Sequence, residues 1–196
     1  MSLQKLLLSP ALDDEFFTHL RLAEQDDARF VAQLHSDATA NRHIDPLSCG
    51  MEQIGADAWK KWLTRYKVRE SAGKEFFLIV RHQMTDFGSL RIHNFNAKRR
   101  SFHWGSWMMK VDRPSGLLAF SAISVYEIGF DVLGFEQAEF DVKTENTDVI
   151  KFHLKSGAEA ISDVDGIRSF VFPRWKFPAF KDANMSRLKM HRCFFG

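Results

Sequence analysis

The chain has 196 residues, of which 45% are hydrophobic and 27% charged, and this balance is ordinary for a globular protein of one domain. Its formal net charge of +2 is too small to indicate nucleic-acid binding by itself. Two cysteines, Cys49 and Cys193, form neither a metal-binding spacing nor a disulfide framework. Their placement indicates a reducing compartment, most simply the cytoplasm.

The first half of the chain reads as an N-terminal lead followed by helices and a strand. The apolar run in residues 1–17 is too short for a secretory signal, and acidic residues follow it at once. After this lead we expect a strand at 19–23, a helix from the Asp26-Asp27 cap to about residue 35, a loop over 41–55, and a helix over 56–72 with a core face of Trp59, Trp62 and Tyr66.

The second half reads as strands interrupted by two helices. We expect strands at 75–81, 87–93 and 101–111, a long helix at 116–133, a strand at 137–143, a helix at 147–156, and strands at 158–164 and 168–173. Turn residues at 86–88 and 94–100 predict antiparallel hairpins. The class is therefore α/β with a mixed, mostly antiparallel sheet, in one domain over 18–173 with a tail at 174–196.

The longest apolar stretch follows a tight turn. Residues 114–135 are too charged for a membrane span, because they include Glu127 and Asp131. The helix that they form begins without a carboxylate, so its free backbone N–H groups and positive dipole end are not neutralised from within. Arg113 adds a positive charge and Gly116 allows close backbone approach. The turn predicts an anion site suited to phosphate or pyrophosphate, with a plain capped core helix as the alternative.

The spacing over 113–157 resembles the acyl-CoA-binding core of the GNAT superfamily of N-acyltransferases. Arg113 and Gly116 match the family's Gln/Arg-x-x-Gly-x-Gly/Ala turn, while Leu118 replaces its second small residue. Leu133-Gly134-Phe135 matches the end of the family's long helix, and Gly134 lies 21 positions after Arg113. The next strand ends at an Asn and the following helix ends at a Gly; the matching residues here are Asn146, Val149, His153 and Gly157, with Ala158 replacing the usual aromatic residue.

The resemblance implies a GNAT fold whose sheet splits between its fourth and fifth strands, and acetyl-CoA as the cosubstrate, with no metal. The pantetheine would meet the backbone of the fourth strand, and the pyrophosphate would lie on the amides of the turn. The residues implied to bind the cosubstrate are Met109, Val111, Arg113, Ser115, Gly116, Leu117, Leu118, Ala119 and Asn146.

Transfer to an amine requires that the amine lose a proton, so a base is needed. Asp141 is the first candidate, because it stands five residues before Asn146, where some relatives carry a Glu, and strand alternation places it on the face of Glu139 and Lys143. A structural carboxylate is the alternative. His103 is the second candidate, with the alternative of an ordinary strand residue.

His153 stands where many relatives carry the Tyr that protonates the CoA thiolate. An imidazolium could do the same, and a neutral packing residue is the alternative. The other histidines show no metal-binding spacing. Trp104 and Trp107 lie three apart on a strand, so we expect them on opposite faces, with one of them lining the cleft.

The resemblance implies an N-acetyltransferase that acts by direct transfer, because no nucleophile is placed to form an acyl-enzyme. The acceptor it implies is a primary amine on a small molecule, for example a nucleotide-linked amino sugar. A peptide or ribosomal-protein N-terminus is one alternative, and a CoA-binding module without catalysis is another. Membrane and nucleic-acid partners are not expected, and an oligomer is allowed.

Overall fold

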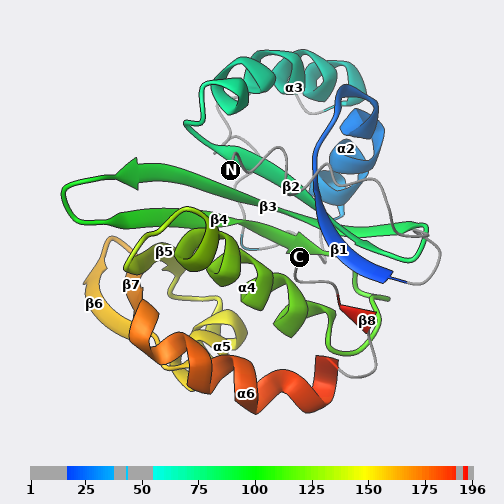
Figure 1. The fold of residues 1–196 in the computed structure, drawn as a ribbon. Coiled ribbons are helices and arrows are strands. Elements are labelled where there is room, and N and C mark those ends of the chain that lie inside the picture. The colour runs from blue at the N-terminus through cyan, green and yellow to red at the C-terminus, as the bar shows by residue number, and fades with distance from the viewer. Residues whose placement is uncertain (1–16, 38–42, 44–54, 189–191, 194–196) are drawn as a thin grey trace.

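A computed structural model describes residues 17–37, 43, 55–188 and 192–193. These residues form one eight-stranded sheet with helices on both faces (Figure 1). Its strand order is β6-β7-β5-β4-β3-β2-β1-β8. The strands are β1 (Phe17–Leu22), β2 (Phe76–His82), β3 (Thr85–Asn96), β4 (Ser101–Met109), β5 (Gln137–Lys143), β6 (Glu159–Val164), β7 (Ile167–Pro173) and β8 (Arg192–Cys193). The predicted α/β class with a mixed, mostly antiparallel sheet is confirmed, because the parallel pairs are β4 with β5 and β1 with β8.

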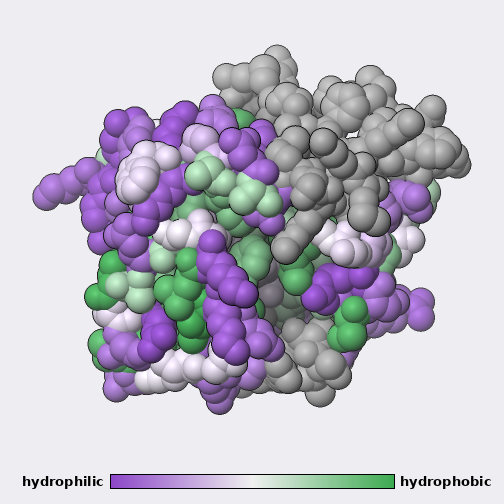
Figure 2. Space-filling view, turned by 90° about the horizontal axis from the view of Figure 1, so that it is seen from below, coloured by the Kyte–Doolittle hydropathy of each residue, from purple (hydrophilic) through white to green (hydrophobic). Residues whose placement is uncertain are grey.

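Helices cover the two faces of the sheet in separate layers (Figure 1). One layer holds α2 (Ala28–Ser36), which follows the short helix η2 (Gln25–Asp27), and α3 (Ala56–Ser71). The other layer holds α4 (Leu117–Glu127), the π-helical turn η4 (Ile128–Val132), α5 (Thr147–Ser156), η5 (Arg174–Lys176) and α6 (Phe177–Leu188). The surface on the side of α5 and α6 is mostly hydrophilic, with hydrophobic residues exposed among the hydrophilic ones (Figure 2).

Each face of the sheet has its own hydrophobic core, because side chains alternate along a strand. In β2, Phe77 and Ile79 pack with Trp59, Trp62 and Tyr66 of α3. This confirms that the aromatic face of α3 is core. The neighbouring residues Phe76, Leu78 and Val80 point to the other face, where a larger aromatic core contains Phe102, Tyr126, Phe130, Phe140, Phe170 and Phe172.

The sheet divides between β4 and β5, as the resemblance implies. The two strands pair in parallel only from Ser101 with Gln137 to His103 with Glu139. Beyond that point β4 pairs with β3, and β5 pairs with β7. The strands therefore open a V whose closed end lies at His103 and Glu139.

A bulge in β4 stands at the point where the V opens. Arg91 of β3 pairs with Gly105 of β4, whereas Ser89, two residues away in β3, pairs with Met108, three residues away in β4. The strand β4 therefore carries one extra residue between these two pairs. Ser106 adopts a left-handed backbone with φ 50°. Beyond the bulge, the alternation of side chains along β4 is reversed.

Besides small shifts at the ends of several elements, one predicted turn and one predicted helix differ from the structure. The β2–β3 turn falls at residues 83–84, not 86–88. Gly88 lies inside β3, where it pairs with Val80 and Met109, and an added Cβ would lie 2.1 Å from the sulfur of Met109. The predicted helix over 116–133 is α4 followed by η4, where the Leu133 amide donates to the Ile128 carbonyl five residues back.

The segment at 174–196, set apart as a tail from the sequence, contains η5 and α6. Phe177 and Phe180 of α6 are buried in the larger core, and Lys181 pairs with Glu127 of α4. The described part of this segment thus packs on the same core as residues 18–173.

Candidate functional site

A small cavity of about 100 Å³ lies where β4 and β5 separate. Its walls come from β4, from β5 and from α5, together with one residue between α2 and α3. The lining residues are His43, Trp104, Gly105, Ser106, Trp107, Phe140, Asp141, Val142, Lys143, Asn146, Val149 and His153. The cavity joins apolar rings to titratable groups, as ligand sites commonly do.

Both tryptophans of β4 line this cavity, so the prediction that only one would do so is wrong. Their ring centroids lie 5.3 Å apart. The bulge at Ser106 supplies the reason, since one extra residue between positions 104 and 107 brings both side chains to the same face.

His153 of α5 lies inside an aromatic cluster. Its ring centroid is 4.1 Å from that of Phe140 and 5.6 Å from that of Trp104, and the residue is 2% exposed. Burial lowers the pKa of His153 to about 3, because the charged ring would lose its hydration there. The ring is therefore neutral near pH 7, which favours the packing alternative over an imidazolium donor. The role of proton donor stays a prediction.

Asp141 of β5 reaches the cavity from the face opposite the aromatic core. Phe140 and Val142 are buried, whereas Asp141 is exposed, so the predicted alternation of β5 is confirmed. The Ser169 hydroxyl of β7 donates a hydrogen bond of 2.7 Å to Asp141 Oδ1. Asp141 is thus placed to meet a cation in the cavity, and its role as a base stays a prediction.

His103 lies at the closed end of the V and is not among the residues that line the cavity. Its Nε2 is 2.7 Å from Glu139 Oε2, and Arg99 donates to the same oxygen at 3.0 Å. Burial disfavours the charged form of Glu139, but hydrogen bonding from Ser101, His103 and Gln137 outweighs it and lowers the pKa of that carboxyl. The structure therefore surrounds His103 with a local charge network instead of grouping it with Asp141.

The structure brings in two residues that sequence reasoning missed. His43 lines the cavity, and its Nδ1 lies 3.3 Å from Glu145 Oε1. The two residues are 102 positions apart in the chain. Neither stands in a recognisable motif, so the contact becomes visible only in the fold.

The turn before α4 has the features predicted for an anion site. Gly116 has φ 88°, a left-handed backbone that glycine adopts without strain, and no acidic residue stands in the first turn of α4. The first N–H groups of a helix have no acceptor within it, so the backbone here can hold phosphate oxygens. Arg113 donates to the Lys110 carbonyl at 2.9 Å, which ties its side chain to this turn. These residues suit the diphosphate of acetyl-CoA.

The other residues implied to bind the cosubstrate divide into buried and accessible ones. Met109, Leu117 and Ala119 are buried, so their side chains belong to the core and only their backbones are available. Val111 is 61% exposed. Asn146 lines the cavity but also caps α5 by accepting from the Val149 amide, so its side chain is partly committed to the helix. Ser115 lies in the turn and is exposed, and Leu118 lies in the first turn of α4 and is half-buried.

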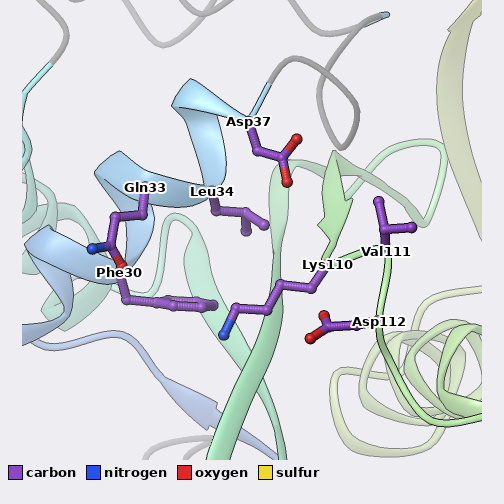
Figure 3. A pocket seen from close by; sticks show the side chains of 7 residues that line it. All are labelled: Phe30, Gln33, Leu34, Asp37, Lys110, Val111 and Asp112. Atoms are coloured by element: carbon purple, nitrogen blue, oxygen red, sulfur yellow. The ribbon is translucent and has the colours of Figure 1, made fainter.

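A second, larger cavity of about 420 Å³ adjoins the exposed end of β4. Figure 3 shows α2 on one side and the segment after β4 on the other, with Phe30 extending toward Lys110. The Lys110 ammonium lies 5.2 Å from the centroid of the Phe30 ring. The remaining lining residues are Gln33, Leu34, Asp37, Val111 and Asp112. This cavity therefore offers one aromatic ring, one cation and two carboxylates close in sequence to the turn before α4.

Among the described residues, no group of three or more His, Cys, Asp or Glu side chains is arranged to hold a metal ion. Within the same residues, no helix is long and apolar enough to cross a membrane.

The split sheet beside an uncharged helix start matches the arrangement that the resemblance implies for α/β proteins that bind an acyl-CoA. The family described as "Acetyltransferase (GNAT) domain" matches residues 18–159. The chain belongs to the GNAT acetyltransferases, and acetyl-CoA is the acyl donor of this family. A comparison with curated proteins gives no match.

Solved structures agree with this assignment. The chain is similar to apo FdhC, "a nucleotide-linked sugar GNAT", with 34% identity, a TM-score of 0.77, and 88% of this chain and 95% of that one covered. It is also similar in fold to spermidine N-acetyltransferase from Vibrio cholerae in complex with CoA and spermine, with 15% identity, a TM-score of 0.66, and coverage of 82% and 98%. The chain is thus an acyl-CoA N-acetyltransferase.

Proposed function

We propose that this enzyme transfers an acetyl group from acetyl-CoA to the primary amine of a nucleotide-linked amino sugar. The observation that carries this proposal is the 34% identity to a nucleotide-linked sugar GNAT over 88% of the chain. We propose the cytoplasm as its compartment, since the two cysteines indicate a reducing environment.

The larger cavity supports an acceptor of this kind. An aromatic ring such as Phe30 can stack on a nucleobase, and an ammonium such as that of Lys110 can pair with a phosphate. Asp37 and Asp112, which line the same cavity, can accept hydrogen bonds from sugar hydroxyls. A polyamine or a peptide N-terminus would leave the Lys110 cation without an anionic partner in the ligand.

The reaction that we propose is direct transfer. The neutral amine attacks the thioester carbonyl, the C–N bond forms, the C–S bond breaks, and the thiolate of CoA leaves and is protonated. Among the described residues that line the cavity between β4 and β5, no serine or cysteine stands in a nucleophile motif, so an acyl-enzyme is not part of the proposal. The enzyme contributes by placing the amine against the thioester.

The test is release of free CoA measured with a panel of amines. The panel contains nucleotide-linked amino sugars, the same amino sugars without the nucleotide, spermidine, and peptides with free N-termini. We expect kcat/KM to be higher for the nucleotide-linked compounds by about 10²-fold or more, since the nucleotide would add contacts with the Phe30 ring and the Lys110 ammonium. Equal or better turnover of spermidine or peptides would overturn the proposed acceptor and leave the acetyltransferase assignment intact.

A pair of variants localises the nucleotide. Lys110→Met should raise KM for the nucleotide-linked acceptor about tenfold, because a charged hydrogen bond to phosphate is worth roughly 1.5–3 kcal/mol. The matched control is Lys98→Met, which removes an exposed lysine from the β3–β4 turn. If both variants behave alike, the larger cavity does not bind the phosphates.

A further inference from the structure

We propose that His43, oriented by Glu145, accepts the proton that the acceptor ammonium must lose before it attacks acetyl-CoA. This inference rests on the proposed transfer to an amine but not on which amine is used. It assigns a catalytic role to His43, which lines the cavity at the split, and a positioning role to Glu145.

The geometry joins two distant parts of the chain at the cavity. His43 comes from the stretch between α2 and α3, and Glu145 comes from the connection between β5 and α5. The His43 side chain is 19% exposed and that of Glu145 64% exposed, with 3.3 Å between Nδ1 and Oε1. The ring is thus mostly enclosed, while its carboxylate partner remains open to solvent. This arrangement keeps the ring beside the cavity without removing the pair from water.

The contact with Glu145 selects one tautomer of the ring. A carboxylate accepts hydrogen bonds, so the neutral ring is favoured with its proton on Nδ1. That leaves the lone pair on Nε2, which is the nitrogen able to take a proton from a substrate.

The other titratable groups of the cavity are less suited to this step. His153 lies in the aromatic cluster, and its ring is surrounded by Phe140, Trp104 and Trp107. The Asp141 carboxylate already accepts from the Ser169 hydroxyl. Lys143 lines the same wall as a cation. We therefore assign to Asp141 the task of attracting the acceptor as an ammonium ion, beside the ring that deprotonates it.

The proton balance of the step is complete. The ammonium gives one proton to His43 Nε2, and the amine that results attacks the thioester carbonyl. As the intermediate collapses, the nitrogen loses a second proton, which ends on the CoA thiolate directly or through water. His43 then returns its proton to solvent. The sum is one amide, one CoA thiol and one proton released.

The kinetic test uses His43→Ala and Glu145→Ala, each first shown to melt like the wild type. We expect His43→Ala to lower kcat by about 10²-fold or more with an unchanged KM for acetyl-CoA, and added imidazole to restore part of the rate. Glu145→Ala should lower kcat about tenfold, because the His43 ring is retained but no longer oriented. The matched control is Glu159→Ala, which removes an exposed carboxylate of β6 that pairs with Lys176. It should turn over like the wild type.

A spectroscopic measurement tests the pair without turnover. In the ¹⁵N NMR spectrum of the ligand-free wild type at pH 8, the His43 ring should show the form protonated on Nδ1. Glu145→Ala should shift the ring toward the form protonated on Nε2. Wild-type turnover in His43→Ala, or a tautomer that does not respond to Glu145→Ala, would overturn the inference. Absence of turnover of every amine by the wild type would instead contradict the proposed function.

Discussion

Asp141 lies on the cavity wall with one carboxylate oxygen held by Ser169, and we propose that its charge attracts the acceptor amine. We expect Asp141→Asn to reduce kcat/KM for the acceptor about 10–10²-fold, mainly through KM, because it removes a charged hydrogen bond worth roughly 1.5–3 kcal/mol. Affinity for acetyl-CoA should not change. Steady-state kinetics with each substrate varied in turn will separate these effects.

The control for this variant is Asp163→Asn, which removes a carboxylate of β6 that pairs with Arg168. A loss in kcat of about 10²-fold or more at saturating acceptor, with an unchanged KM for the acceptor, would show that Asp141 takes the proton instead of His43.

His153 offers a contrasting test at the scale of one residue. Burial lowers its pKa to about 3, so the imidazolium is scarce at pH 7. Phe retains the ring contacts with Phe140 and Trp104, and we expect turnover of His153→Phe to stay within about threefold of the wild type, below the usual range of acid–base catalysis. A loss of tenfold or more, recovered by His153→Tyr, would show that a proton or hydrogen bond from position 153 reaches the thiolate.

At the scale of the element, we propose that binding of acetyl-CoA depends on the start of α4. Gly116 has φ 88°, so any side chain there strains the backbone, although Asn tolerates this conformation best. The pair Gly116→Asn and Gly116→Asp therefore separates strain from charge. We expect Gly116→Asp to weaken acetyl-CoA binding at least about tenfold more than Gly116→Asn, as measured by calorimetry. Equal affinities in two folded variants would exclude this turn as the phosphate site.

The π-helical turn η4 predicts a stability effect away from the site. A Cβ added to Gly129 would lie 2.1 Å from the Phe102 ring, which is fully buried. Gly129→Ala should therefore destabilise the fold by about 1–3 kcal/mol through overpacking. Gly105→Ala is the control, because nothing lies within 4 Å of its added Cβ. Similar urea midpoints for the two variants would show that Phe102 moves aside at little cost.

The elements best predicted from the sequence carried local signals at both ends. Helix α5 begins after Asn146, whose side chain accepts from the Val149 amide, and ends at Gly157 with φ 97°. Its predicted range of 147–156 is confirmed because cap chemistry is local. The bulge at Ser106 was missed because a non-glycine residue with positive φ carries no such signal. His43 and Glu145 were missed because only the assembled fold brings them together.

At the scale of the whole molecule, three histidines couple stability to pH: His35 and His153 are buried, and His93 is half-buried. Burial lowers the pKa of His35 and of His93 to about 4, and that of His153 to about 3, from the ordinary value of 6.5. In the unfolded chain each would bind a proton at higher pH than in the folded one. Their contribution to stability is therefore complete above about pH 6.5 and is lost as the pH falls toward 4 and 3.

This linkage predicts that the free energy of unfolding is lower at pH 5.5 than at pH 7.5. Below pH 6.5 each such histidine costs about 1.4 kcal/mol for each pH unit, until the pH nears its folded-state pKa. His153→Phe removes one of the three histidines and keeps the ring packing. Between pH 7.5 and pH 5.5 its free energy of unfolding should therefore fall by about 1.4 kcal/mol less than that of the wild type. Both proteins have the same carboxylates, so the contribution of these groups to the pH dependence of stability cancels in this difference. Urea unfolding at the two pH values measures this difference. If the free energy of unfolding falls equally in both proteins, His153 is protonated in the folded state. The imidazolium would then again be a candidate acid for the thiolate.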